Sequence, residues 1–84
     1  MRRLGFIEVA LRSGLLVVKP RGVDVTRLLN SPVYDESYRR VGRIVDVIGR
    51  VDDPRVIVKL ESGAQVSSSL LYYSAREKRR GRRR

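Results

Sequence analysis

The sequence predicts an all-β domain, folded as a small closed barrel of six short antiparallel strands. β-branched residues fill two runs, Val41 to Ile48 and Val56 to Leu60, on either side of a turn that contains Asp52, Asp53 and Pro54. Similar clusters of Gly, Pro, Asp and Ser separate the other apolar runs, and no stretch has a helical period of useful length. Because closure removes exposed strand edges, a barrel is the expected arrangement for so many short strands in one small domain.

The first two strands form a hairpin. Residues 4–12 alternate, and we expect the odd positions to point inward. Ser13 and Gly14 supply the turn, and residues 15–19 are apolar on both faces, which is typical of a strand that is covered on each side. The remaining strands are expected at residues 33–34, 41–48, 55–60 and 70–73, with Val56, Val58 and Leu60 inward.

The connections are polar and carry turn residues. Residues 23–31 are expected to send Leu28 and Leu29 into the core before a turn at residues 30–32. Residues 35–40 form a polar bend, and residues 61–69 form a loop. Gly42 and Gly49, near the ends of the longest strand, indicate a bulge or a sharp bend.

The net charge of +10 is concentrated at one end of the chain. Residues 76–84 hold seven basic side chains and one acidic, which is +6, whereas residues 1–75 hold twelve and eight, which is +4. We therefore expect a barrel domain over 1–75 and a disordered basic tail over 76–84. The tail is a candidate for non-specific RNA binding, although it equally fits a solvated tail that keeps the protein soluble. The candidate RNA-binding residues are Arg76, Lys78, Arg79, Arg80, Arg82, Arg83 and Arg84.

Few residues of this chain are suited to catalysis. It has no cysteine and no histidine, so we expect no metal site, no cofactor and no enzymatic activity. Asp52 and Asp53 are interpreted as turn residues, because neighbours on an extended chain point apart. The four tyrosines are interpreted as core or rim residues, with base stacking as the alternative. The apolar runs are far shorter than the ~20 residues of a membrane-spanning helix, and we expect a cytoplasmic protein that does not associate with membranes.

Several short motifs occur in an order that is specific in combination. The order resembles that of the archaeal glycine-arginine-rich (Gar-one) subunit family of H/ACA RNA–protein particles, over residues 4 to about 73. The matching segments are Leu4-Gly5, Ser13-Gly14-Leu15, Val33-Tyr34-Asp35, the run from Val41 to Val51, Pro54-Arg55-Val56 and Leu71-Tyr72.

The resemblance implies a six-stranded barrel of the translation-factor or reductase-isomerase type, in an archaeal cell. It also implies a non-catalytic subunit that docks on the catalytic domain of a dyskerin-like pseudouridine synthase, within a guide-RNA particle that holds other small subunits. In that family the barrel makes little or no contact with RNA. It promotes turnover of substrate RNA during rRNA pseudouridylation and ribosome biogenesis.

The candidate partner-binding residues lie in the family motifs, with the turn from Gly49 to Arg55 as the main docking surface. Two of them depart from the family pattern: Arg50 replaces the usual Pro, and Arg55 replaces a frequent aromatic. The full set is Val33, Tyr34, Gly42, Gly49, Arg50, Val51, Pro54, Arg55 and Val56.

Two other functions stay open from the sequence. A stand-alone RNA-binding barrel of the OB or Sm-like type would need aromatic and basic side chains on one sheet face, which the sequence pattern does not place there. A related assembly factor shares the core domain, but it carries long extra segments that 84 residues leave no room for.

Overall fold

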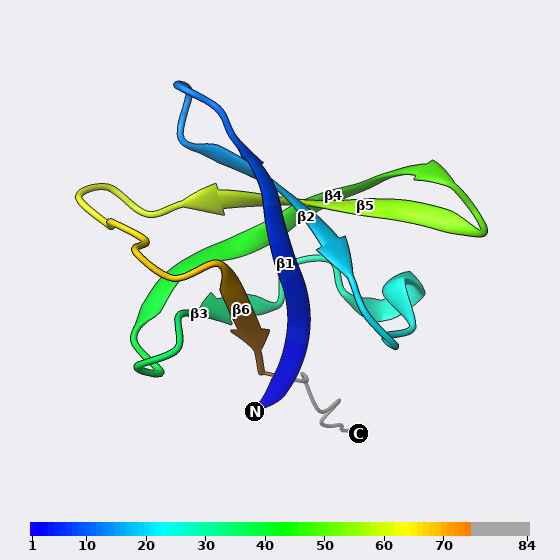
Figure 1. Ribbon diagram of the computed structural model, residues 1–84, viewed down its shortest axis with the longest axis horizontal. Helices are drawn as coiled ribbons and strands as arrows, with labels where there is room; N and C mark the ends of the chain where they lie inside the picture. The colour runs from blue at the N-terminus through cyan, green and yellow to red at the C-terminus, as the bar shows by residue number, and fades with distance from the viewer. Residues whose placement is uncertain (75–84) are drawn as a thin grey trace, which may run out of the picture.

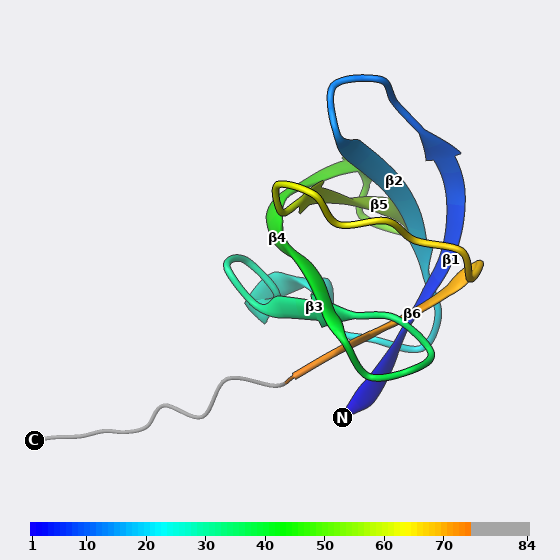
Figure 2. The same ribbon diagram turned by 90° about the vertical axis from the view of Figure 1, so that its left-hand side faces the viewer.

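The computed structural model describes residues 1–74, and these form the expected closed six-stranded antiparallel barrel (Figures 1 and 2). Around the barrel the strands follow the order β1-β2-β5-β4-β3-β6, and every neighbouring pair is antiparallel. The strands are β1 (Arg2–Ala10), β2 (Leu15–Pro20), β3 (Pro32–Tyr34), β4 (Arg40–Arg50), β5 (Asp53–Leu60) and β6 (Leu70–Tyr73), and a single 3₁₀ turn, η1 (Val25–Arg27), precedes β3.

The β1–β2 hairpin turns where the Ser-Gly pair predicts, but the inward positions of β1 differ from the expected alternation. Leu4 is fully buried, whereas Val9 and Leu11 are about half exposed. Two register shifts cause the difference: one lies between Arg3 and Gly5 against β6, the other between Ile7 and Val9 against β2. Each bulge adds a residue to one strand and moves the following side chains to the other face, so the rule that odd positions point inward is wrong here.

The longest strand, β4, follows a polar turn and pairs with β5 through the next turn. On its N-terminal side, the Asp35 carboxylate accepts hydrogen bonds from the backbone N–H groups of Ser37 and Arg39, at 2.9 and 3.0 Å. This Asx-type turn is the expected polar bend. On its C-terminal side, β4 pairs with β5 along its length, apart from a register shift between Ile44 and Asp46.

The segment between β2 and β3 is only partly as expected. Asp24 caps η1 by accepting from Thr26 N–H at 3.0 Å. Leu28 enters the core, but Leu29 is 53% exposed, so its predicted burial is wrong. The backbone explains the difference, because Leu28 C=O accepts from Ser31 N–H and Asn30 N–H donates to Ile44 C=O. This tight turn directs the side chain of Leu28 into the core and that of Leu29 toward solvent.

The interior is small and almost wholly aliphatic. Alternate residues of β5, Val56 and Val58, are fully buried, as predicted. The other core side chains are Leu4, Leu16, Val18, Leu28, Val33, Val41, Ile44, Leu71 and Tyr73. At roughly 25 cal/mol per Å² of apolar surface, this core supplies most of the stability of so small a domain.

The barrel closes tightly because two glycines allow backbones to approach each other. A Cβ atom at Gly5 would lie 2.0 Å from the carbonyl oxygen of Lys19, and one at Gly42 would lie 2.2 Å from that of Lys59. Any side chain at either position would push β1 from β2 or β4 from β5. The expected bend at Gly42 is therefore a site of close strand packing within β4.

The expected basic tail and its candidate RNA-binding residues lie outside the described residues. Over residues 1–74, no helix has the length and the apolar character needed to cross a membrane.

A single substitution tests the inward assignment of β5. Val56→Asp places a carboxylate at a site with no exposed surface, at a cost of several kcal/mol, which is comparable to the roughly 5–15 kcal/mol that stabilises a typical domain. We expect loss of the cooperative thermal transition, measured by circular dichroism. Val51→Asp is the matched control: it makes the same change at a fully exposed site of the same hairpin and should melt like the wild type. Cooperative melting of Val56→Asp near the wild-type temperature would contradict the assignment.

Candidate docking surface

The β4–β5 hairpin ends in a tight turn that projects from the barrel. Arg50 pairs with Asp53, so only Val51 and Asp52 lie between the strands. Neither has a positive φ, whereas Gly49, one residue before the pair, has φ = +95°. A two-residue hairpin turn normally takes its positive φ at its central residues, and here the glycine supplies it. Figure 1 shows this hairpin extending past the other strands at one side of the molecule.

Val51, at the end of this hairpin, is the most exposed large apolar side chain in the described chain. Its relative exposure is 101%, so it makes no measurable contact with the rest of the barrel. Pro54, across the hairpin, is half-buried and stiffens the turn. An apolar residue that contributes nothing to the fold, on a rigid turn, is typical of a surface that contacts another protein.

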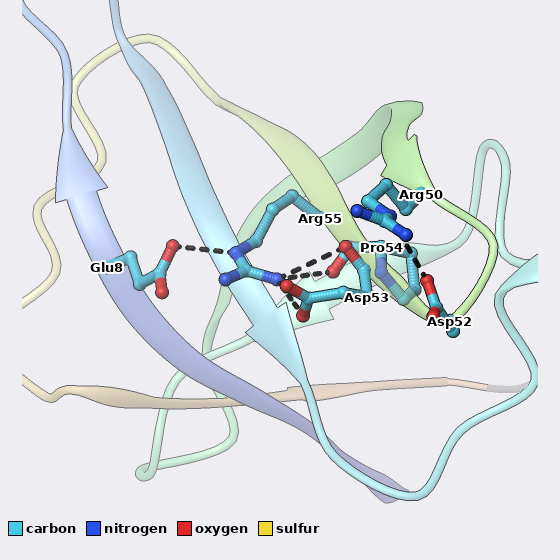
Figure 3. A network of polar contacts seen from close by, with 6 residues as sticks. All are labelled: Glu8, Arg50, Asp52, Asp53, Pro54 and Arg55. Atoms are coloured by element: carbon cyan, nitrogen blue, oxygen red, sulfur yellow. Dashed lines mark hydrogen bonds and ion pairs between the residues drawn. The ribbon is translucent and has the colours of Figure 1, made fainter.

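Arg55 ties the hairpin to the body of the barrel. Its Nε donates to Glu8 Oε1 on β1 at 2.8 Å, and its Nη1 donates to Asp53 Oδ1 at 2.7 Å (Figure 3). The same Nη1 reaches the carbonyl oxygen of Pro54 at 3.0 Å. Since β2 lies between β1 and β5 in the sheet, the guanidinium connects the two outer strands of a three-stranded stretch.

These contacts set the charge state of the hairpin base. The hydrogen bonds that Arg55 donates to Glu8 and Asp53 raise its pKa further above the usual value, and Arg55 in turn lowers the pKa of Asp53 below 3.8. Both shifts favour the charged forms of Arg55 and Asp53 at neutral pH. By contrast, Arg50 and Asp52 form a single, exposed ion pair at 3.5 Å, of the kind that contributes little to stability.

The structure separates the predicted partner-binding residues into a buried group, one half-buried tyrosine and a group on one hairpin. Val33, Gly42 and Val56 are buried in the barrel wall, so these residues shape the scaffold and offer no surface to a partner. Tyr34 is half-buried at the β3–β6 pairing. The structure brings the rest together on one hairpin: Gly49, Arg50, Val51, Pro54 and Arg55. Of its two arginines, Arg50 is exposed with one long ion pair to Asp52, and Arg55 is held by Glu8 and Asp53.

Sequence reasoning missed the residues that complete this surface. Glu8 lies 47 residues from Arg55 in the chain, and no local pattern pairs them. Ile48 is 46% exposed near the end of β4, although its place in a β-branched run predicts a strand residue without indicating its face. The register shift between Ile44 and Asp46 determines that face.

The tyrosines lie at the rim and core, as interpreted from the sequence. Tyr73 is buried, and Tyr38 packs edge-on against Tyr72 with ring centroids 5.3 Å apart. Tyr34 is opposite Tyr72 in the β3–β6 pair, so these two side chains lie on one face of the sheet, and Tyr38 extends this group at the rim. Within residues 1–74, no cluster of three or more acidic side chains is placed to hold a metal ion.

Comparison with known proteins finds a similar chain. No family model matches. A curated protein named H/ACA ribonucleoprotein complex subunit GAR1, from Encephalitozoon cuniculi (strain GB-M1), is 35% identical over 54 residues, which cover 64% of this chain. The matched part covers 29% of that relative, so the chain spans less than a third of its length. The resemblance found in the motifs is confirmed to this extent: over these 54 residues the chain is similar to a GAR1 subunit.

The pKa shift of Asp53 predicts a pH-dependent stability. Because the folded-state pKa is depressed, the contribution of Asp53 is present above its ordinary value of 3.8 and is lost as the pH falls through the lower folded value. Asp53→Asn should lower the melting temperature at about pH 7, and the difference from wild type should shrink at about pH 3. Asp52→Asn, whose partner is 3.5 Å away and exposed, is the control and should have little effect at either pH. Equal melting temperatures of wild type and Asp53→Asn at neutral pH would contradict the proposed role of the ion pair.

Proposed function

We propose that this barrel is a non-catalytic subunit of an H/ACA guide-RNA particle, and that it docks on the catalytic domain of the pseudouridine synthase. Similarity to a GAR1 subunit supports membership of the particle. The observation that carries the docking proposal is Val51, an apolar side chain that is fully exposed on a stiff hairpin turn. The proposed role of the complex is pseudouridylation of rRNA, with the barrel promoting release or turnover of substrate RNA.

The geometry of the hairpin suits a docking role. A few residues near the centre of an interface carry much of the binding free energy. Large apolar side chains and arginine are enriched at such interfaces. Val51 would form the centre, with Pro54 beside it and Arg50 at the edge. Because Arg55 fixes the base of the hairpin to β1, little conformational entropy is lost when the turn is held by a partner.

Arg50 gives the surface a polar edge that differs from the family pattern. Its side chain is 83% exposed and its only ion pair in residues 1–74 is with Asp52. Such a charge changes mainly the rate of association with a charged partner. We therefore propose that Val51 contributes to the lifetime of the complex and Arg50 to the rate of its formation.

Calorimetric titration with the purified synthase tests the docking surface. Val51→Asp should weaken binding by roughly tenfold or more, since it buries a charge at the centre of the interface. Val9→Asp is the matched control: it makes the same change at an exposed site on β1 and should bind as the wild type does. Circular dichroism checks that all variants are folded.

Association kinetics separate the role of Arg50. Arg50→Glu should slow association, with a larger effect at low salt, and change dissociation little. Wild-type affinity in folded Val51→Asp would place the docking surface on another face of the barrel. Failure of the wild-type chain to bind the synthase would overturn the proposed function itself.

A further inference from the structure

A second surface, at the end of the barrel where the chain enters and leaves, is strongly basic. A groove of about 950 Å³ lies between the start of β1, the end of β6 and the segment that joins β2 to β3. Its size is within the roughly 300–1,000 Å³ of typical ligand sites. It shares no residue with the β4–β5 hairpin, so it is separate from the docking surface.

Four arginines line this groove: Arg2, Arg3, Arg21 and Arg27. None of them forms a salt bridge within residues 1–74. The one acid that lines the groove is Asp24, so the lining carries four positive charges against one negative. The hydroxyl and backbone N–H of Thr26 both donate to Asp24 Oδ1, at 2.6 and 3.0 Å. The groove thus offers guanidinium groups without ion-pair partners, which bind phosphate oxygens in a bidentate manner.

Two further groups point to a ligand with both oxygens and flat rings. Ser31 lines the groove with a side-chain hydroxyl that is buried and has no hydrogen-bond partner in the described chain. A buried hydroxyl without a partner is rare in folded proteins, and a ligand oxygen or a water in the groove would satisfy it. Phe6 is 44% exposed, and the guanidinium of Arg21 lies 6.0 Å from its ring centroid. This pair is a platform of the type on which bases stack.

The chain itself favours a long polyanion over a small one. Arg2 pairs with Tyr73, so β6 ends beside the start of β1 (Figure 1), and both residues line the groove. The residues that follow in the sequence, 76–84, carry a further charge of +6. A ligand with regularly spaced negative charges and exposed rings could contact the arginines, the Ser31 hydroxyl and the Phe6 ring together. We propose that the groove binds single-stranded RNA, with the arginines on phosphates and Phe6 under a base.

This assignment differs from what the family resemblance implies, which is little or no RNA contact by the barrel. It also does not depend on the docking proposal, since a barrel that fails to bind the synthase could still bind RNA through the groove. The specific claim is that arginines of the barrel itself contact the RNA backbone.

Charge-matched variants of the full chain test the groove. The probe is a labelled uridine oligomer of about 12 nucleotides, within the range of sites that single-strand binders cover, followed by fluorescence anisotropy over a series of salt concentrations. The groove variant Arg21→Ser/Arg27→Ser and the control Arg12→Ser/Arg43→Ser lose the same charge, and Arg12 and Arg43 lie outside the groove. The groove variant should bind roughly tenfold more weakly or worse at about 0.1 M salt, with a salt slope reduced by one to about two, and the control should differ little from wild type.

Two additional measurements identify the ligand. Phe6→Leu, which keeps an apolar side chain but removes the ring, should weaken RNA binding severalfold without changing the salt slope. Unlabelled RNA should displace the probe at a much lower concentration than a polyglutamate peptide of equal charge.

Three outcomes would overturn the proposal. Equal losses in the groove and control variants would assign binding to overall charge and to residues 76–84. Equal competition by polyglutamate would assign the groove to an acidic protein segment. Absence of RNA binding by the wild-type chain would exclude the groove as an RNA site. Circular dichroism of each variant establishes that it is folded.

Discussion

Two close contacts between backbones set the shape of this barrel. At Gly5 and Gly42 the neighbouring strand lies so near that a Cβ would meet a carbonyl oxygen at 2.0 and 2.2 Å. The approach lets strands of three to eleven residues close around about a dozen core side chains. A domain of this size has little surplus stability. The positions of the surface loops and turns therefore depend on a barrel whose geometry requires glycine at positions 5 and 42.

The rigid wall holds two surfaces with different chemistry. The β4–β5 hairpin presents an apolar side chain, with its base fixed by Arg55 to Glu8 and Asp53. The groove at the other surface presents guanidinium groups without ion-pair partners and an unsatisfied buried hydroxyl. An apolar turn suits a protein partner, and a basic groove with an aromatic platform suits a nucleic acid. The two proposed partners, a protein and an RNA, therefore bind separate surfaces of the barrel.

Sequence patterns predicted the strands and turns well, because these depend on local chemistry. The Ser-Gly turn, the Asp35 bend and the alternation of Val56 and Val58 are all where the residues indicate. The facing of β1 was not predictable, since the bulges at Gly5 and after Ile7 arise from pairing with β6 and β2. Leu29 was misplaced because a tight turn anchored to Ile44 overrides its hydrophobicity. The motifs predicted the hairpin of the candidate site. The ion pair of Arg55 with Glu8 could not be predicted, because the two residues are distant in sequence. The basic groove could not be predicted for the same reason, since three separate segments line it.

Amide hydrogen exchange of the full chain, alone and bound to the pseudouridine synthase, tests the central claim most directly. It locates the interface without any substitution, and it reads both surfaces in one experiment. If the β4–β5 hairpin is the docking surface, exchange should slow at residues 49–55 in the complex and stay unchanged at residues 21–31 of the groove. Protection of residues 21–31 or of the β1–β2 turn, with none at residues 49–55, would contradict it.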